Sequence, residues 1–315
     1  MKMTHTMHPQ QTGLTLIEIL VAMVISLILM AGVLQIFQAN RQSFRVQESL
    51  SLIQENGRTA MRILAEDLRI ATFWGCRSQD VTSIKNNLNP AGAGYVDLLA
   101  NGGIAGTNND GLNASDSITI NGARSDGFAL SSPIGDPSND IPVTNGNGIQ
   151  PGDVMLITNC ERGEFFQVTN AAPLGPADLI EHAAGGPMPP GNSTDDLSFG
   201  RYETEAVVFP TRQTTYAIAA DPDSNEPSLI RTEGAAETLV EGIEDMQIAY
   251  GQLIDDGNGD MRYVPADAAG LDMRQVRSVR ITLTARSIAS NVAVGGDGHL
   301  RRTFSNTISI RNRNP

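Results

Sequence analysis

The chain has 315 residues and a formal net charge of −13. Phosphate backbones require a basic protein face, so this acidity argues against nucleic acid as a main ligand. Lys2 and Lys85 are the only lysines among 22 basic residues. Such a preference for arginine suits forked pairing with carboxylates at protein contacts, or reflects a GC-rich genome.

An apolar run begins at Leu14 and continues to Phe37, with Glu18 as its only charge. As a helix this run would be roughly 36 Å long, enough to cross a hydrocarbon core about 30 Å thick. In a secretory signal the small-residue cleavage site follows the apolar stretch, whereas here Gly13 precedes it. A cut after Gly13 would therefore keep the hydrophobic helix on the mature chain as a membrane anchor.

Glu18 is an unusual residue for a membrane-spanning helix. An ionised acid at the centre of such a helix costs about 3 kcal/mol on insertion scales, so Glu18 either reaches water near the interface or has a partner. One interpretation is a simple anchor that tolerates an acid near one end. The other is that the carboxylate makes a specific contact.

The short leader, Gly13, the apolar helix and Glu18 as the fifth residue after the cut together resemble the type III signal of type IV pilins and type II secretion pseudopilins. The resemblance implies that a prepilin peptidase cuts after Gly13 and methylates the amino group of Leu14. It also implies that Glu18 pairs with an N-terminal amine in the growing filament. One departure is Leu14 itself, because the first mature residue in these families is most often Phe.

The helix is predicted to continue past the anchor, because residues 38–74 contain no proline and carry apolar side chains at intervals of three and four. A continuous helix from about Leu14 to Phe73 would be roughly 90 Å long. Two separate helices joined near Asn40 are the alternative, and Gly32 and Gly57 are candidate points of bending. The predicted buried face comprises Leu50, Ile53, Gly57, Ala60, Met61, Leu64, Leu68 and Ala71.

Beyond Trp74 the sequence changes to short β-like runs between Gly, Asn, Asp and Pro clusters, which predicts an antiparallel sheet with long loops. The clearest strand lies between Arg277 and Arg286, where apolar and polar residues alternate. Further strands are predicted at 117–120, 154–158, 165–168, 206–209, 214–218, around 246–250 and around 304–310. Long irregular stretches at 86–114, 131–152 and 171–198 are interpreted as partner-contacting loops, with disorder as the alternative.

The final third carries Val240-Glu241-Gly242-Ile243-Glu244-Asp245-Met246, then an Asp/Gly-rich turn, then Val276-Arg277-Ser278-Val279. This run, with Gly75-Cys76 and Asn159-Cys160, resembles the PilW-type minor pilins. The resemblance implies a low-abundance subunit that joins other minor pilins and a large tip-associated protein to prime pilus assembly. It also implies an α+β, pilin-like fold, in which a long N-terminal helix packs on an antiparallel β-sheet head.

The chain contains two cysteines, Cys76 and Cys160. Behind an anchor that sends the head outward, an even pair in an oxidising compartment predicts one disulfide. Closing a loop of about 85 residues would stabilise the head by roughly 4 to 5 kcal/mol in the chain-entropy model. Two buried free thiols are the alternative.

A second candidate site is the run Asp255-Asp256-Gly257-Asn258-Gly259-Asp260. Asp256, Asn258 and Asp260 alternate as calcium ligands do, and Asp267 falls at the twelfth position of an EF-hand loop. Met261 stands where that motif needs Gly, and Asp267 is shorter than the usual Glu. The alternative is a hairpin turn between strands at Tyr250 and Tyr263.

The sequence offers little for catalysis. His5 and His8 would leave with the leader, and neither His182 nor His299 lies beside a recognisable nucleophile motif. We therefore expect a non-enzymatic protein without a cofactor, with calcium as the one candidate metal ion.

The sequence predicts four segments: a leader (1–13), a transmembrane and filament-core helix (14–39), an amphipathic half of the helix (40–74) and a periplasmic β-rich head (75–315). The expected location is the bacterial inner membrane, with a single pass, and later the pilus, at its tip. A type II secretion minor pseudopilin is the first alternative function. A membrane-tethered binding module or adhesin is the second.

Overall fold

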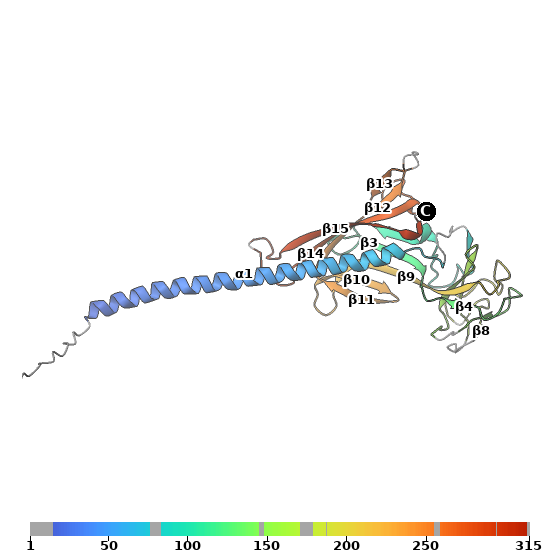
Figure 1. Cartoon of the computed structure of the whole chain (residues 1–315), viewed down its shortest axis with the longest axis horizontal. Helices are drawn as coiled ribbons and strands as arrows, with labels where there is room; N and C mark the ends of the chain where they lie inside the picture. Colours follow the sequence, from blue (N-terminus) through green and yellow to red (C-terminus); the bar gives the residue numbers. More distant parts are fainter. Residues whose placement is uncertain are drawn as a thin grey trace, which may run out of the picture.

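The computed structural model describes residues 15–75, 83–144, 148–170, 179–186, 188–254, 259–293 and 295–313. A single long helix, α1 (Leu16–Ile70), projects from a β-rich head (Figure 1). It has 55 residues and is therefore about 80 Å long. It passes through Asn40 without a break, so the alternative of two joined helices is wrong.

The helix ends close to the predicted residues. Thr15 is its N-cap in an extended conformation, and Ala71 returns to extended backbone at the other end. Thr72 then adopts a φ of +60°, in the left-handed region that no α-helix can continue through. The helix therefore ends at Ile70, three residues before Phe73.

The second half of α1 buries one face against the head. The buried positions recur at helical spacing and are Ser49, Ile53, Gly57, Ala60, Leu64, Ala65 and Leu68. They confirm most of the predicted face. Leu50, which was predicted to lie on it, is 37% exposed and falls outside the stripe.

Gly57 allows the closest approach of α1 to the head. A Cβ atom at this position would overlap the ring of Phe304, whereas nothing lies within 4 Å of the corresponding position at Gly32. Both glycines were candidate points of bending, but the helix is continuous at both. The role of Gly57 is to make room for an aromatic ring.

A four-stranded sheet with the order β13-β12-β14-β15 packs directly on α1. All three of its neighbouring pairs are antiparallel. Val279, Ile281 and Leu283 alternate with polar residues along β14, and all three are fully buried, as predicted. The strands are β12 (Ile243–Leu253), β13 (Met261–Val264), β14 (Val276–Arg286) and β15 (Arg301–Ser309).

A larger sheet has the path β1-β7-β6-β9-β10-β11, with β2, β3 and β4 joined at its side. Its pair β1–β7 is parallel, a detail that the expected antiparallel head did not include. The strands are β1 (Ile84–Asn86), β2 (Ile104–Thr107), β3 (Ser117–Ala123), β4 (Phe128–Ala129), β6 (Val154–Thr158), β7 (Gly163–Gln167), β9 (Val207–Ala220), β10 (Pro227–Glu233) and β11 (Ala235–Glu241).

β9 links the two ends of the head. The sequence predicted two strands here, and the structure has one, with Pro210 in its interior. Before Thr211 this strand pairs with β4 and β6, and from Thr211 it pairs with β3 and then β10. Proline lacks an N–H donor, and it is tolerated here because it lies where the strand exchanges one set of partners for another.

The hairpin of β10 and β11 was not predicted. It turns at Gly234, whose φ is +76°, and its strands carry Pro227, Glu233 and Glu237, residue types that are depleted in strands. In Figure 1 this hairpin lies on one side of α1 and β15 lies on the other. The helix therefore runs between two strands that each end a sheet.

Two of the three long stretches interpreted as loops, 131–152 and 171–198, build part of a second core where they are described, and the stretch 86–114 contributes Leu88, Leu98 and Ile104 to other cores. Ile134, Ile141, Val143 and Ile180 are at most 2% exposed and pack together at the far end of the head. The stretches also contain β5 (Ile141–Pro142), β8 (Leu179–Ile180), and the short helices η2 (Ala100–Gly103) and η3 (Leu112–Ala114). The described parts of these stretches are therefore folded and contribute buried residues to the head.

The end of the chain closes onto the head through η4 (Met273–Gln275) and η5 (Arg311–Arg313). The buried Arg313 guanidinium donates to the carbonyl oxygens of Val276 at 3.2 Å and Asn101 at 3.3 Å. Burial lowers the pKa of Arg313 to about 10. This arginine binds backbone carbonyls in place of the carboxylate that the composition suggested.

Candidate assembly surfaces

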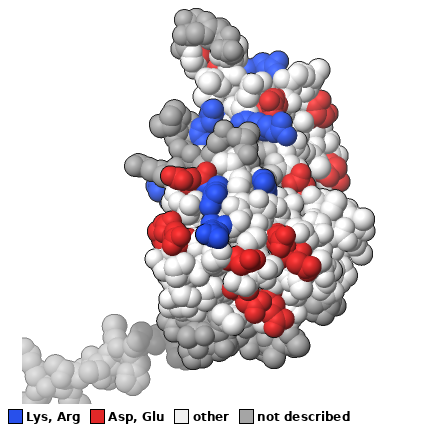
Figure 2. Space-filling view, turned by 90° about the vertical axis from the view of Figure 1, so that its right-hand side faces the viewer, with Lys and Arg blue, Asp and Glu red and all other residues white. Residues whose placement is uncertain are grey.

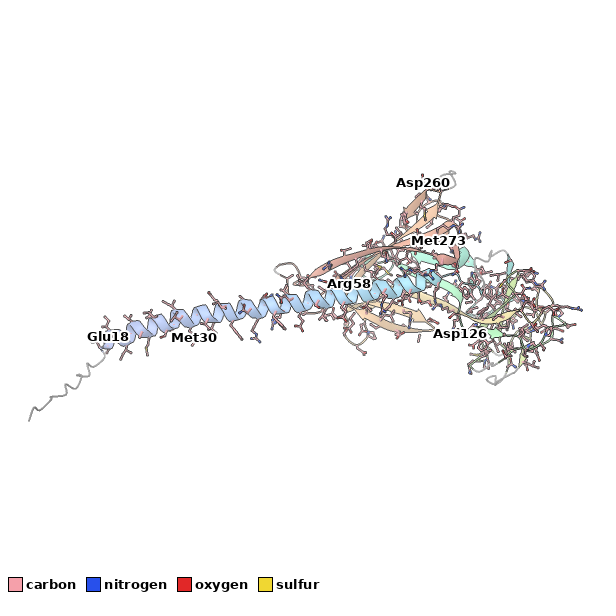
Figure 3. All side chains as sticks on the ribbon, viewed as in Figure 1. Glu18, Met30, Arg58, Asp126, Asp260 and Met273 are labelled. Atoms are coloured by element: carbon pink, nitrogen blue, oxygen red, sulfur yellow. The ribbon has the colours of Figure 1, made fainter. Side chains whose placement is uncertain are left out.

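The first half of α1 is an uncovered apolar surface. From Thr15 to Glu48 the helix has no buried residue, and most side chains up to Phe37 are large and apolar (Figure 3). Within the described residues, α1 is the one helix long and apolar enough to cross a membrane. The surface is suited to lipid or to other helices, because water would be excluded from it in either setting.

Glu18 lies at the start of this surface and has a local partner. Its carboxylate accepts hydrogen bonds from the Thr15 backbone N–H and the Thr15 hydroxyl, both at 2.9 Å. The arrangement is a capping box, in which an acid in the first turn satisfies a donor at the N-cap. Capping therefore accounts for an acid at this position even in the isolated chain. Gly13 and Leu14 lie outside the described residues.

Small side chains continue the stripe of Glu18 along the helix. Ala22 and Ser26 follow at intervals of four, and the Ser26 hydroxyl donates to the Ala22 carbonyl at 2.7 Å. Larger apolar residues border this stripe and form a shallow hollow of about 560 Å³, lined by Glu18, Ile19, Ala22, Met23, Ser26, Leu27 and Met30. Small residues on such a stripe permit another helix to approach closely.

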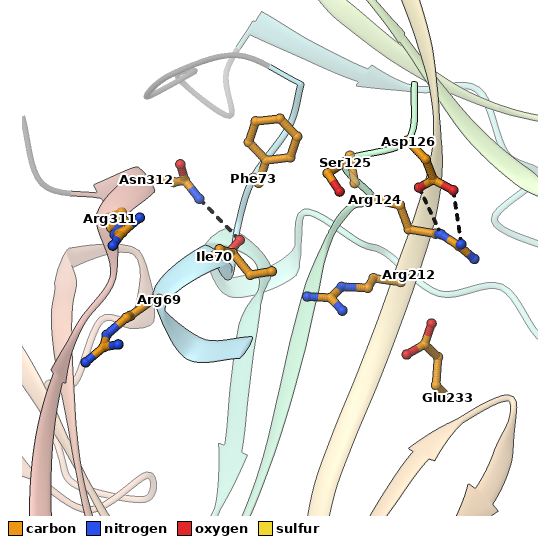
Figure 4. Close-up of a pocket in the computed structure, with 11 residues that line it drawn as sticks. Arg69, Ile70, Phe73, Arg124, Ser125, Asp126, Arg212, Glu233, Arg311 and Asn312 are labelled. Atoms are coloured by element: carbon orange, nitrogen blue, oxygen red, sulfur yellow. Dashed lines mark hydrogen bonds and ion pairs between the residues drawn. The ribbon is translucent and has the colours of Figure 1, made fainter. Parts of the chain in front are cut away.

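A cavity of about 640 Å³ lies where α1 ends (Figure 4). Ile70 and Phe73 supply apolar surface, and Arg69, Arg212 and Arg311 lie around it. Arg212 pairs with Asp67 at 3.5 Å, and Arg124 pairs with Asp126 at 3.0 Å. Neither Arg69 nor Arg311 contacts an acid among the described residues. The cavity therefore offers free guanidinium groups beside an apolar floor.

The surface charge of the head is mixed. Figure 2 shows the end of the molecule away from the free half of α1, where acidic and basic side chains are interspersed. Such a pattern differs from the continuous basic face that nucleic acid requires.

Comparison with known protein families covers both ends of the chain. Residues 8–34 match the prokaryotic N-terminal methylation motif. Residues 215–312 match the family described as type IV pilus-assembly protein W. The chain matches a PilW-type type IV pilin. No curated protein and no solved structure matches the chain.

The two matches fall on the parts of the chain that the long helix brings together. The methylation motif includes Glu18 and the exposed apolar part of α1 as far as Leu34. The PilW match contains part of β9, the β10–β11 hairpin and the four-stranded sheet that packs on the buried half of α1. The far core, built around β5, β6 and β8, lies between the two matched segments.

The predicted disulfide stays a prediction, because Cys76 lies outside the described residues. The chain just before it is placed close to Cys160. Gly75 lies against the side chain of Thr158, so closely that a Cβ at Gly75 would come within 2.6 Å of the Thr158 methyl group. Thr158 also accepts, through its hydroxyl, a hydrogen bond from the Cys160 N–H at 3.2 Å. The two segments are therefore close enough for a bridge to be sterically reasonable.

The calcium hypothesis is not tested by the structure, because Asp256 and Asn258 lie outside the described residues. Asp260 is exposed, and Asp267 accepts a hydrogen bond from the Asn108 amide at 3.0 Å. In the part of the chain that the structure describes, no group of three or more His, Cys, Asp or Glu side chains is arranged to hold a metal. The predicted hairpin is present, with β12 and β13 paired from Tyr250 to Leu253.

The two histidines of the head have structural surroundings. His182 is buried and its Nε2 lies 3.0 Å from the Asn139 carbonyl oxygen. His299 has its Nδ1 at 2.6 Å from the Ser287 carbonyl oxygen. Each ring makes a hydrogen bond with a backbone carbonyl group, and neither ring contacts a nucleophile among the described residues.

Glu164 is a fully buried acid that the sequence reasoning missed. Its carboxylate accepts hydrogen bonds from the Asn87 amide at 2.6 Å and the Tyr202 hydroxyl at 2.9 Å, and from the backbone N–H groups of Ser198 and Phe199. Burial raises the pKa of Tyr202 above its ordinary range, and the nearby Glu164 charge adds to the effect. Every residue of β7 is buried, so this strand is covered on both faces, and the position of Glu164 directly before Phe165 and Phe166 was the available signal.

Proposed function

We propose that this pilin is a minor pilin that takes part in priming type IV pilus assembly, in a complex of minor pilins at the pilus tip. The observation that carries the proposal is the combination of a bare apolar half-helix with a PilW region folded onto the other half. A helix whose large apolar residues are exposed from Leu16 to Phe37 needs lipid before assembly and neighbouring helices afterwards. The role is structural and non-enzymatic.

The processing step follows from the same segment. A prepilin peptidase would cut after Gly13 and methylate the amino group of Leu14, within the span of the methylation motif. The chain would lose Lys2 and keep the whole of α1. Before assembly it would sit in the inner membrane with a single pass and a periplasmic head beginning near residue 75.

Glu18 is proposed as an assembly contact with the N-terminal amine of a neighbouring subunit. Its exposed carboxylate accepts two hydrogen bonds from Thr15, and a carboxylate has capacity for more. An amine–carboxylate pair would neutralise a charge that is otherwise costly in apolar packing. The Thr15 contacts would then hold the carboxylate in place.

Recovery of partners tests this function. The full-length chain, carrying an affinity tag after Pro315, would be purified from membranes and from sheared pili. Co-purification with other minor pilins and a tip-associated protein is expected. Recovery with the type II secretion apparatus, or with neither set, would contradict the proposal and favour a pseudopilin or a tethered binding module respectively.

A further inference from the structure

Strand β15 ends its sheet and has an open edge. It pairs with β14 on one side, and no described strand pairs with it on the other. The N–H of Ile310 donates to the Arg277 carbonyl at 3.0 Å, and the Leu300 carbonyl accepts from Ser287 at 2.8 Å. In an antiparallel pair of strands, residues that hydrogen-bond to the partner strand alternate with residues that do not. The backbone N–H and C=O groups that point away from β14 are therefore those of Arg301, Thr303, Ser305 and Thr307.

Beyond the charged residues Arg301 and Arg302, this edge lacks several of the features that protect edges. From Thr303 to Ser309 the strand contains no charge and no proline. Neither a bulge nor a register shift interrupts its pairing with β14. An open, regular and uncharged edge of this kind is a template for another strand.

A groove runs beside the edge, between β15 and α1. We call it the arginine groove, and it is lined by Arg58, Met61, Arg62, Ala65, Glu66, Arg69, Phe304, Ser305 and Asn306. Arg58, Arg62 and Arg69 are exposed and lie on one flank of α1, at helical spacing. None of the three has an ion pair within the described part of the chain.

The arginine groove continues into the cavity at the end of α1. Arg69 lines both hollows, whose volumes are about 380 Å³ and 640 Å³. Arg311 adds a further guanidinium, and no acid occurs between Arg301 and Arg313. On a chain with a net charge of −13, this flank of the stalk is locally basic.

The opposite flank of α1 carries an acidic and an amide side chain that contact the head. There Asp67 pairs with Arg212, and the Asn56 amide donates to the Glu241 carbonyl at 3.0 Å. Those contacts tie α1 to the larger sheet. The basic side chains next to β15 make no equivalent contact, so stabilising the fold does not account for them.

We propose that the open edge of β15 and the arginine groove together accept an extended acidic segment of a neighbouring pilus subunit. The segment adds a strand to the four-stranded sheet through backbone hydrogen bonds. Its carboxylates meet Arg58, Arg62 and Arg69, which sets its direction and excludes basic segments. The identity of the neighbour as a pilus subunit rests on the proposed function.

A peptide-binding experiment tests this inference on the full-length chain in detergent micelles. The probe is a short fluorescent peptide that alternates glutamate with valine, and binding is followed by fluorescence anisotropy. Binding is expected, and it should weaken as salt is raised. Arg58→Glu together with Arg62→Glu should lower the affinity about tenfold or more. Arg45→Glu, a single change of the same kind on another flank of α1, should leave it unchanged.

Two further probes separate strand addition from simple charge attraction. A version of the peptide with alternate N-methylated amides keeps every carboxylate but cannot pair with the edge, so it should not bind. Hydrogen exchange at Ser305 and Thr307 should slow when the unmodified peptide is present.

Absence of binding, or equal binding of a lysine peptide, of the N-methylated peptide or of heparin, would overturn the inference. So would unchanged affinity in the Arg58→Glu, Arg62→Glu variant. These outcomes leave the proposed function standing, because processing and co-purification are measured separately.

Discussion

At the scale of single residues, close contacts explain why certain side chains occupy positions that their type disfavours. Glu18 is an acid on an apolar helix, yet Thr15 supplies two donors to it. Glu164 is an acid at 0% exposure, yet an amide, a hydroxyl and two backbone N–H groups surround its oxygens. In both cases hydrogen-bond donors satisfy the carboxylate oxygens, and among the described residues neither acid has an arginine or lysine partner.

The Glu18→Ala variant tests the assembly role. The peptidase recognition region around Gly13 is unchanged, so we expect processing to continue. Incorporation should fail, because the neighbouring amine would be left without its carboxylate. Processing is measured by the mass shift of the chain, and incorporation by its amount in sheared pili. Ser26→Ala, on the same stripe, should be incorporated normally. Normal incorporation of Glu18→Ala would exclude the pairing role.

Gly57 offers a second test at this scale. Gly57→Ala would place a methyl group inside the Phe304 ring and should destabilise the contact of α1 with the head by about 1 to 3 kcal/mol. Gly32→Ala is the matched control, since it meets nothing within 4 Å and should strengthen the helix by roughly 0.5 to 1 kcal/mol. Urea unfolding of both variants in detergent measures the difference. Equal stability of the two would show that α1 does not dock through Gly57.

At the scale of elements, much of the structure follows from periodicity in the sequence. The alternation in β14 predicted its strand and its buried face, and the apolar spacing after Asn40 predicted the packed half of α1. The β10–β11 hairpin lacks such a signal, because it is stabilised by β9 and by a turn at Gly234. The packing of the long stretches depends on contacts such as the Asn192 amide with the Gln167 carbonyl at 2.8 Å, which no local pattern encodes.

The candidate sites also differ in whether the sequence alone could predict them. Glu18 was recognisable from its distance to Gly13, because a spacing rule defines it. Arg58, Arg62 and Arg69 are absent from the predicted buried face, but their position beside an open edge depends on where β15 lies. Such a site requires tertiary structure, and sequence periodicity alone does not reveal it.

An ion-pair cluster between elements predicts a dependence of stability on pH. Glu244, at the start of β12, accepts from Arg301 of β15 at 2.5 Å and lies 3.8 Å from Arg286 of β14. The hydrogen bond from Arg301 lowers the pKa of Glu244 below its ordinary value of 4.5. The unfolded state therefore binds the proton more readily, so this contribution is present above pH 4.5 and is lost as the pH falls through the lower, folded value.

The measurement for this cluster is the urea midpoint as a function of pH. Glu244→Gln should be less stable than the natural chain at neutral pH, and the gap should narrow as the solution becomes acidic. Asp126→Asn, in an exposed pair with Arg124, is the control and should change little. A gap that stays constant with pH would rule out ionisation of Glu244 as its source.

At the scale of the whole molecule, the chain is a long helix with two different halves. In one half no residue is buried, and the other half forms a core with both sheets. The proposed disulfide would close the head beyond the end of the helix, where Gly75 meets Thr158. Such a division suits a subunit that leaves a membrane and enters a polymer through the same helix.

The disulfide is tested by alkylating the unreduced chain under denaturing conditions. We expect Cys76 and Cys160 to remain unmodified until a reductant is added. Replacing both by serine should destabilise the head by roughly 4 kcal/mol, because the unfolded chain would regain the freedom of a long loop. Modification of both thiols without reductant would show that the bridge does not form.

The mass of the mature N-terminus tests the central claim most directly. The full-length chain would be purified from its native membrane and its N-terminal peptide measured by mass spectrometry. The account predicts a chain that begins at Leu14 with a methylated amino group. A chain that still begins at Met1 would contradict it, because an uncut leader leaves no Leu14 amine for Glu18 of a neighbour to bind.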